Sequence, residues 1–278
     1  MSLNAAFLED RGVVRVSGED AASFLQGVLT NDVQKLEPRE ARYAALLTPQ
    51  GKILFDALVA RLPADSGDAF LLDCAGAQAA DFAKRLGFYK LRAKVTIADE
   101  SADHGVLAYW GGEPENAPGA IVYADPRAAE LGYREVLPRA KAAAIGEASL
   151  AEYDALRVFL GVPKGGVDFP YGDTFPHEAN MDALRGVDFE KGCYVGQEVV
   201  SRMKHRGGPR KRVVRVTLGG DPPAPGTPVL DGELAVGTLG AAAGRQALAL
   251  LRLDRAEDAR AAGRELSVGG VGVVVEGS

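Results

Sequence analysis

The stretch Lys191-Gly192-Cys193-Tyr194-Val195-Gly196-Gln197-Glu198 places a thiol, a cation, a carboxylate and two glycines within eight residues. A cysteine reacts or binds metal as its thiolate, and a neighbouring cation or helix N-terminus favours that form. Lys191 supplies such a cation. The residues that follow predict a short helix, in which Glu198 and Arg202 have the i,i+4 spacing of an ion pair. A buried structural cysteine in a tight loop is the alternative, because free cysteine is among the most buried residue types.

Other segments surround this stretch in an order that is typical of one protein family. Arg202 and Arg206-Gly207 follow the cysteine directly, and four more segments are spread along the chain, at residues 24–32, 47–56, 157–163 and 175–178. Together they resemble the YgfZ family, folate-binding proteins that support iron–sulfur enzymes and are similar in fold to the glycine-cleavage T-protein. The resemblance covers most of the chain.

This resemblance implies an α+β fold in which three domains form a ring. A discontinuous folate-binding domain would comprise residues 1–50 and 141–205 and would carry the cysteine stretch. Residues 51–140 would form a ferredoxin-like middle domain, and residues 206–278 a small C-terminal β-barrel. Alternating strands with Gly/Pro turns after Arg212 agree with the barrel.

The function that the resemblance implies is support for the assembly or repair of iron–sulfur clusters in client enzymes, with tetrahydrofolate as cofactor. The partners would be iron–sulfur client or assembly proteins, with tRNA-modifying radical enzymes among the clients. A transient contact between Cys193 and a cluster is one hypothesis, since a single thiolate cannot complete the usual four-cysteine site. The chain would then not be a classical turnover enzyme.

Two alternatives remain open. A folate-dependent aminomethyltransferase of the T-protein type is the first, although Phe159 stands where those relatives carry a glutamate. The second is an interaction module without chemistry, which would use the basic residues between Arg202 and Arg215 to bind a partner.

The candidate site residues combine the cysteine stretch with the matching segments. We assign chemical roles to Cys193, Lys191 and Asp56, and no metal site. The resemblance further implies folate contacts, and the residues assigned to them are Asp56, Tyr89, Arg92, Arg157, Gln197, Glu198 and Arg202.

Several of these residues also have ordinary structural interpretations. Asp56 is a lone carboxylate on the apolar face of a predicted strand at residues 52–62, and a solvated position near the turn is the alternative. Tyr89 could be a packing residue and Arg92 a solvated one. Arg157 could bind the glutamyl tail of folate or form an ion pair on the helix surface. We expect His177 to be a surface histidine.

The composition is that of an ordinary globular protein, with 47% hydrophobic and 25% charged residues. The net charge of −6 argues against direct nucleic-acid binding, for which a basic domain is typical. The charges are nevertheless uneven, because residues 199–218 contain seven basic side chains and no acidic one. Such a run suits an anionic ligand or partner, or is simply a solvated loop.

Cys74 and Cys193 lie far apart and form no ligand-spaced cluster. We expect Cys74 to be structural. The sequence shows no signal-peptide pattern and no apolar run long enough to cross a membrane. From these features we expect a cytoplasmic protein with reduced thiols.

The local patterns predict a β-hairpin from residues 42–48 and 52–62. Ser149 and Glu152 have the spacing of a capping box before an amphipathic helix that ends at Gly161. Ser17 and Asp20 have the same spacing before an earlier helix. Residues 141–149 read as a linker, and the polar residues 30–32 as caps of local backbone.

Overall fold

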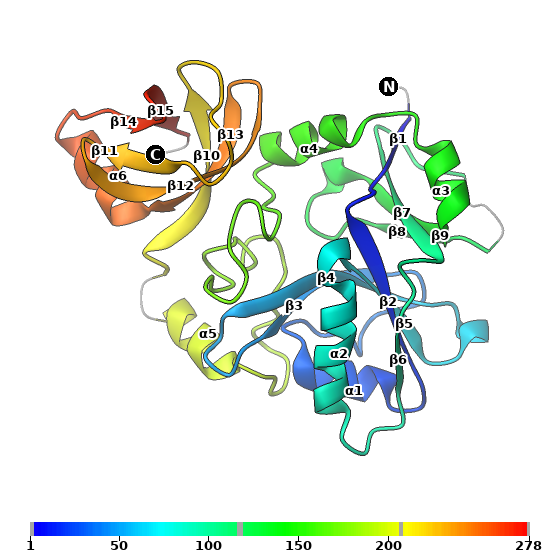
Figure 1. The fold of residues 1–278 in the computed structure, drawn as a ribbon. Helices are drawn as coiled ribbons and strands as arrows, with labels where there is room; N and C mark the ends of the chain where they lie inside the picture. Colours follow the sequence, from blue (N-terminus) through cyan, green and yellow to red (C-terminus); the bar gives the residue numbers. More distant parts are fainter. Residues whose placement is uncertain (1–2, 116–118, 206–207, 277–278) are drawn as a thin grey trace.

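The computed structural model of the chain describes residues 3–115, 119–205 and 208–276, and consists of two antiparallel sheets and a closed barrel (Figure 1). These units surround the irregular segment of residues 160–196. Helices and strands are mixed in the way expected of the α+β class, so that prediction is confirmed. No helix in the described ranges is long and apolar enough to span a membrane.

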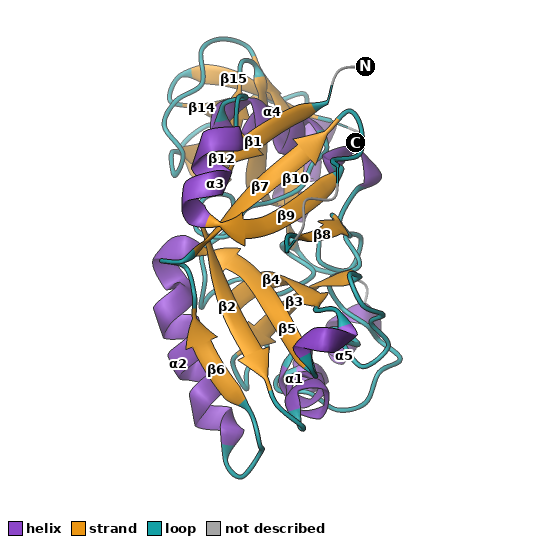
Figure 2. Cartoon of the chain, turned by 90° about the vertical axis from the view of Figure 1, so that its right-hand side faces the viewer, coloured by secondary structure: helices purple, strands orange, loops and turns teal. Residues whose placement is uncertain are grey.

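The first sheet has five strands, whose order from one edge to the other is β3, β4, β5, β2 and β6. They are β3 (Ala41–Leu47), β4 (Ile53–Arg61), β5 (Ala69–Ala75), β2 (Arg11–Ser17) and β6 (Thr96–Asp99). Helices α1 (Ala21–Val28) and α2 (Ala79–Lys90) pack on one face of this sheet. Figure 2 shows α2 running alongside β6. The opposite face is turned toward the rest of the molecule, and it carries Asp56 beside Leu58.

The second sheet has four strands in the order β1, β7, β9 and β8. They are β1 (Asn4–Phe7), β7 (His104–Trp110), β9 (Tyr133–Pro138) and β8 (Ile121–Ala124). Helix α3 (Arg139–Ile145) packs on this sheet. The connections between described elements contain the short 3-10 helices η1 (Ala64–Ser66), η2 (Gly76–Gln78) and η3 (Ala129–Leu131).

The domain boundaries expected from the sequence do not follow these sheets. A boundary after residue 50 would divide the β3–β4 hairpin, in which Ala45 pairs with Asp56. The expected ferredoxin-like unit of residues 51–140 is shared between both sheets, since β4, β5 and β6 belong to one and β7, β8 and β9 to the other. Backbone pairing therefore runs across both expected boundaries, and the domain division stays a prediction.

Two local predictions also need correction. Residues 141–149 are not simply a linker, because α3 continues to Ile145. The capping box at Ser17 does not form: Asp20 is the N-cap of α1 without a side-chain cap, and its carboxylate accepts a hydrogen bond from the Lys94 amide. The second capping box is confirmed, because Ser149 and Glu152 bond reciprocally at the start of α4 (Leu150–Phe159).

After the irregular segment, α5 (Gln197–His205) precedes the C-terminal barrel. The barrel closes through β10, β13, β12, β11, β14 and β15. Its elements are β10 (Lys211–Leu218), β11 (Pro228–Asp231), β12 (Leu234–Ala243), β13 (Gln246–Arg252), α6 (Leu253–Ala261), β14 (Leu266–Val268) and β15 (Val271–Val275). Because β10 also pairs with β15, the sheet has no free edge strand. The predicted small barrel is confirmed.

Candidate functional site

Lys191 is buried and anchors the loop that carries Cys193. Its ammonium group donates hydrogen bonds to the carbonyls of Gln26 (2.7 Å), Leu29 (2.6 Å) and Asn31 (2.9 Å) at the end of α1. The last carbonyls of a helix have no partner within the helix, and a cation at this end stabilises them. Burial lowers the pKa of Lys191 to about 8, so the amine is still mostly protonated at pH 7. We expected the charge of Lys191 to favour the thiolate of Cys193. The structure corrects this, because the ammonium group is bonded to the carbonyls at the end of α1.

The polar residues at the end of α1 fix the same loop. Thr30 donates to the carbonyl of Gly186 (2.6 Å) and accepts from the amide of Ala45. The Asn31 side-chain amide donates to the carbonyls of Tyr43 (2.7 Å) and Arg185 (2.6 Å). These residues are buried and bridge distant segments, so they do more than cap local backbone. They join the loop to the β3–β4 hairpin.

A glycine fixes the other end of the loop. Gly196 has a φ of +82°, and a Cβ there would lie 2.6 Å from the carbonyl oxygen of Thr48. A Cβ at Gly192 would meet no atom within 4 Å. Cys193 lies between these glycines and is exposed, which excludes the buried structural alternative. The loop is thus held at both ends while its thiol faces solvent.

The polar residues of α5 form local contacts. The side-chain oxygen of Gln197 accepts a hydrogen bond from the amide of Tyr194 (3.3 Å). Glu198 and Arg202 form the predicted ion pair, with 2.6 Å between nitrogen and oxygen, on the exposed side of the helix. Arg206 lies outside the described residues. None of the three α5 residues lines the cavity beside Asp56, so the structure does not unite the expected folate contacts.

Asp56 is buried and accepts hydrogen bonds from two tyrosines. One is Tyr43, at 2.9 Å, and the other is Tyr171, from the irregular segment. Burial raises the pKa of both tyrosines, and the Asp56 charge raises it further. The adjoining cavity measures only about 30 Å³. Asp56 is therefore not a solvated residue near the turn, but its carboxylate is already engaged by the protein.

Buried ion pairs fill the space around Asp56. Arg11 pairs with Asp73 at 2.5 Å and Arg127 with Asp125 at 2.7 Å, while Arg134 contacts both carboxylates at 3.4 Å. Burial acts to raise the pKa of Asp125, but Arg127 outweighs it and brings the value down to about 2. These guanidinium groups are satisfied within the protein.

Arg157 also bonds to several protein partners. Its guanidinium contacts Asp168 and Asp154, each at 2.6 Å, and donates to the carbonyl of Val162. It is buried, so the expected surface ion pair is corrected to a largely buried one, which Nε and Nη1 form. Asp168 also accepts from the amide of Ala241 in the barrel. Arg157 thus helps to dock the barrel against α4.

Tyr89 and Arg92 lie apart from Asp56. Tyr89 packs with the apolar cluster beneath α1 and α2, on the face of the first sheet opposite to Asp56. Arg92 is exposed just beyond α2. The structure therefore supports packing for Tyr89 and solvation for Arg92. Cys74 is buried, and burial raises its pKa to about 12, which fits the structural role expected for it.

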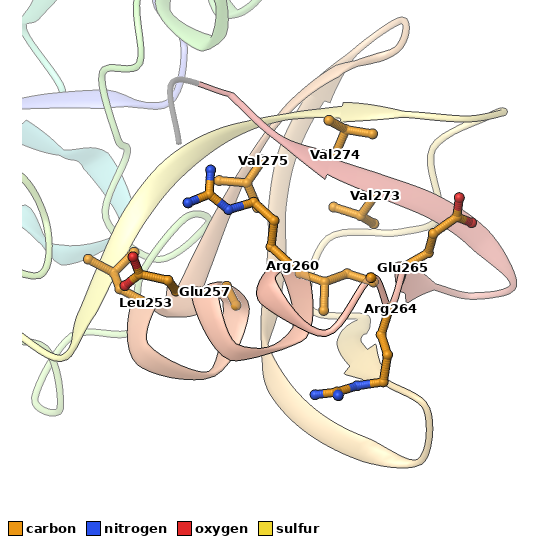
Figure 3. Close-up of a pocket in the computed structure, with 11 residues that line it drawn as sticks. Leu253, Glu257, Arg260, Arg264, Glu265, Val273, Val274 and Val275 are labelled. Carbon is orange, nitrogen blue, oxygen red and sulfur yellow. The ribbon is translucent and has the colours of Figure 1, made fainter.

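A larger hollow of about 550 Å³ lies on the C-terminal barrel, between α6 and β15 (Figure 3). Leu253, Val273 and Val275 contribute apolar surface, and Glu257 and Arg260 project from the helix. None of the predicted site residues lines this hollow. It is a separate feature of the barrel.

Comparison with known proteins shows which family this chain belongs to. Residues 9–151 match the GCVT N-terminal domain, and residues 210–277 match the CAF17 C-terminal beta-barrel domain. The mitochondrial iron–sulfur cluster assembly factor IBA57 of Mus musculus is 35% identical over 279 residues, covering 88% of this chain and 76% of the mouse protein. The chain belongs to the IBA57 family.

A further relative is similar to this chain in sequence, and a solved structure is similar to it in fold. The mitochondrial IBA57 homolog of Mycosarcoma maydis is 39% identical over 230 residues, covering 77% of this chain. The chain spans only 57% of that relative's length. Glycine cleavage system aminomethyltransferase T from Bartonella henselae shares the fold, with a TM-score of 0.77 at 19% identity over 98% of this chain and 84% of that one.

These relatives correct the expected location. The curated IBA57 proteins of Mycosarcoma maydis, Mus musculus and Homo sapiens are all named as mitochondrial. The cytoplasmic location predicted from the sequence is therefore wrong by this comparison. The prediction used only the lack of a signal-peptide or membrane-span pattern, which does not identify a compartment.

Proposed function

We propose that this chain supports the assembly or repair of iron–sulfur clusters in client proteins, and that Cys193 is the side chain that contacts iron or sulfur. The observation that carries this proposal is an exposed thiol on a loop held by Lys191 and Gly196. The names of the IBA57 relatives, which are cluster assembly factors, support the same class of function. So does the resemblance to the YgfZ family.

The chemistry of Cys193 requires a second protein. Iron–sulfur clusters are usually held by four cysteine thiolates. Within the described residues, no group of three or more His, Cys, Asp or Glu side chains could hold a metal ion. Cys193 would therefore supply one ligand or one sulfur contact, while a client or assembly protein supplies the others. An exposed thiol suits contact with such a partner.

Tetrahydrofolate is the cofactor that the YgfZ resemblance implies, and the residues around Asp56 do not fit it in this conformation. Ligand pockets usually enclose about 300–1,000 Å³, whereas the cavity beside Asp56 measures about 30 Å³. Both Asp56 and Arg157 already bond to protein partners. We therefore derive no chemical step through folate. Isothermal titration of the purified chain with tetrahydrofolate tests its binding directly.

Aminomethyl transfer receives no support from the geometry. Phe159 replaces the glutamate of the T-protein pattern, and its ring is 60% exposed beside Arg215. Asp56 would be the remaining acid–base group, but two tyrosine hydroxyls already donate to it.

The proposed function is tested in cells that lack this protein. We would measure the activity of an aconitase-type [4Fe–4S] enzyme under mild oxidative stress, after re-supplying wild type, Cys193→Ala or Gly192→Ala. Wild type and Gly192→Ala should restore activity, and Cys193→Ala should not, at equal protein levels. Full restoration by Cys193→Ala would overturn the role of the thiol. Cluster enzymes that never lose activity would overturn the function as a whole.

A further inference from the structure

A hollow of about 370 Å³ lies between the irregular segment, α5 and the start of the barrel. The residues that line it include His177, Asp182, Phe189, Lys204 and Arg212. Phe189 lies in the loop just before Cys193, and Lys204 lies on the helix that follows it. The hollow is therefore built from both sides of the loop that displays the thiol.

His177 lines this hollow and has no hydrogen-bond partner. Its side chain is only 3% exposed, contrary to the surface position expected from the sequence, and neither ring nitrogen bonds to any described residue. Phe189 packs against the imidazole with ring centroids 5.7 Å apart and holds it in place. A neutral imidazole carries one donor and one acceptor. Buried polar groups are normally paired, so an unpaired one calls for a partner.

The charges around His177 favour an anion. Asp182 pairs with Arg212 through Oδ2 at 2.6 Å, so these two charges offset each other, while its buried Oδ1 has no hydrogen-bond partner among the described residues. The ammonium of Lys204 lies 3.9 Å from the centre of the Phe189 ring, and among the described residues no carboxylate pairs with it. Arg210 is exposed and likewise forms no ion pair within the described part of the chain. The lining thus carries one uncompensated positive charge, in a protein whose net charge is −6.

We infer that this hollow receives the carboxylate of an aspartate or glutamate side chain from a protein partner. Both His177 ring nitrogens are covered in this structure, so the ring turns toward the hollow to donate its N–H to the carboxylate. The Lys204 ammonium then lies beside that carboxylate. Arg210 extends the positive surface beyond the hollow, as an acidic segment of a protein requires. The inference rests on the proposed function for its biological meaning, because the hollow is lined by Phe189 and Lys204, which flank Cys193 in the sequence. Binding itself does not need the thiol.

The test uses histidine NMR of the full chain with a hexaglutamate peptide as the probe. Burial lowers the pKa of His177, with Asp182 opposing this effect and Arg212 and Lys204 adding to it. A bound carboxylate should raise that pKa and shift the His177 ring resonances, leaving those of His104 unchanged. Hexaglutamine should produce neither effect.

Variants locate the binding. His177→Phe keeps an apolar ring and Lys204→Gln changes only an exposed side chain, and each should weaken hexaglutamate binding by about tenfold. Lys84→Gln removes an exposed cation on α2 and should leave binding unchanged. Equal binding of hexaglutamine, wild-type affinity in Lys204→Gln, or equal losses in Lys84→Gln would overturn the inference. Glutarate binding as tightly as the peptide would also overturn it, by indicating a small-anion site.

The two proposals can fail separately. Hexaglutamate that does not bind, together with a Cys193→Ala variant that fails to restore cluster enzymes, removes only the carboxylate site. Peptide binding at His177, together with a Cys193→Ala variant that restores them, removes only the role of the thiol.

Discussion

Lys191 is buried and Cys193 is exposed, although only Gly192 separates them. The Lys191 ammonium closes the end of α1 through three carbonyls, while the thiol faces solvent. The cation and the thiol of this motif therefore have different tasks. One holds the loop in place, and the other is exposed on its surface.

Replacing Lys191 tests the anchor. Lys191→Met removes three charge-assisted hydrogen bonds and leaves buried carbonyls unpaired, so we expect it to lower the free energy of unfolding by roughly 3 kcal/mol. Urea denaturation measures the change. Lys35→Met is the control, because Lys35 is a largely exposed partner of Asp32 and such pairs contribute little. Similar stability of the two variants would contradict the anchoring role.

The two cysteines should differ in reactivity. Cys193 is exposed, whereas Cys74 is buried and has a pKa raised to about 12. Because the thiolate is the reactive form, DTNB should titrate one thiol per native chain and two in guanidinium chloride. Cys193→Ala should lose the fast reaction completely. Fast reaction of two native thiols would show that Cys74 is accessible.

The sequence predicted the parts of the structure that depend on neighbouring residues. The capping box at Ser149, the β3–β4 hairpin and the ion pair between Glu198 and Arg202 form as expected. Each depends on residues a few positions apart, or on a single turn. The family motifs also predicted the fold class and the C-terminal barrel.

The predictions that failed concern partners that are distant in sequence. Nothing near Asp56 indicates that Tyr171, 115 residues away, donates to it. The spacing of Lys191 and Cys193 suggests a shared site, but the preceding loop turns the lysine toward α1. The burial of His177 depends likewise on Phe189 and on the start of the barrel. Local periodicity carries no information about such contacts.

Asp56 should matter for stability. Asp56→Ala leaves the buried hydroxyls of Tyr43 and Tyr171 without their acceptor, which we expect to cost about 2–4 kcal/mol. Tyr171→Phe removes one donor and leaves Tyr43 in place, so its cost should be about 1 kcal/mol. Thermal unfolding followed by circular dichroism measures both. An Asp56→Ala variant as stable as wild type would mean that this contact is unimportant for the fold.

Acidification should remove stability through Asp125. Its folded-state pKa of about 2 lies below the ordinary value of 3.8, so its contribution is present above pH 3.8 and is lost as the pH falls toward 2. Linkage gives this loss an order of about 2 kcal/mol. Urea denaturation between pH 4.5 and 2.5 should show a shallower pH dependence for Asp125→Asn than for wild type. Asp65→Asn, at an exposed site, should keep the wild-type slope, and an unchanged slope in Asp125→Asn would contradict the prediction.

The two glycines that flank Cys193 provide a matched pair for testing how the thiol is presented. Gly196→Ala would force a side chain into a left-handed backbone and place Cβ 2.6 Å from the Thr48 carbonyl oxygen, whereas Gly192→Ala meets open space. We expect Gly196→Ala to cost roughly 2 kcal/mol or more and to speed hydrogen exchange in residues 192–198. In cells lacking the protein, it should restore cluster enzymes less well than Gly192→Ala at equal protein levels. If both variants restore activity fully while Gly196→Ala measurably loosens the loop, the function needs an exposed thiol but not a fixed one.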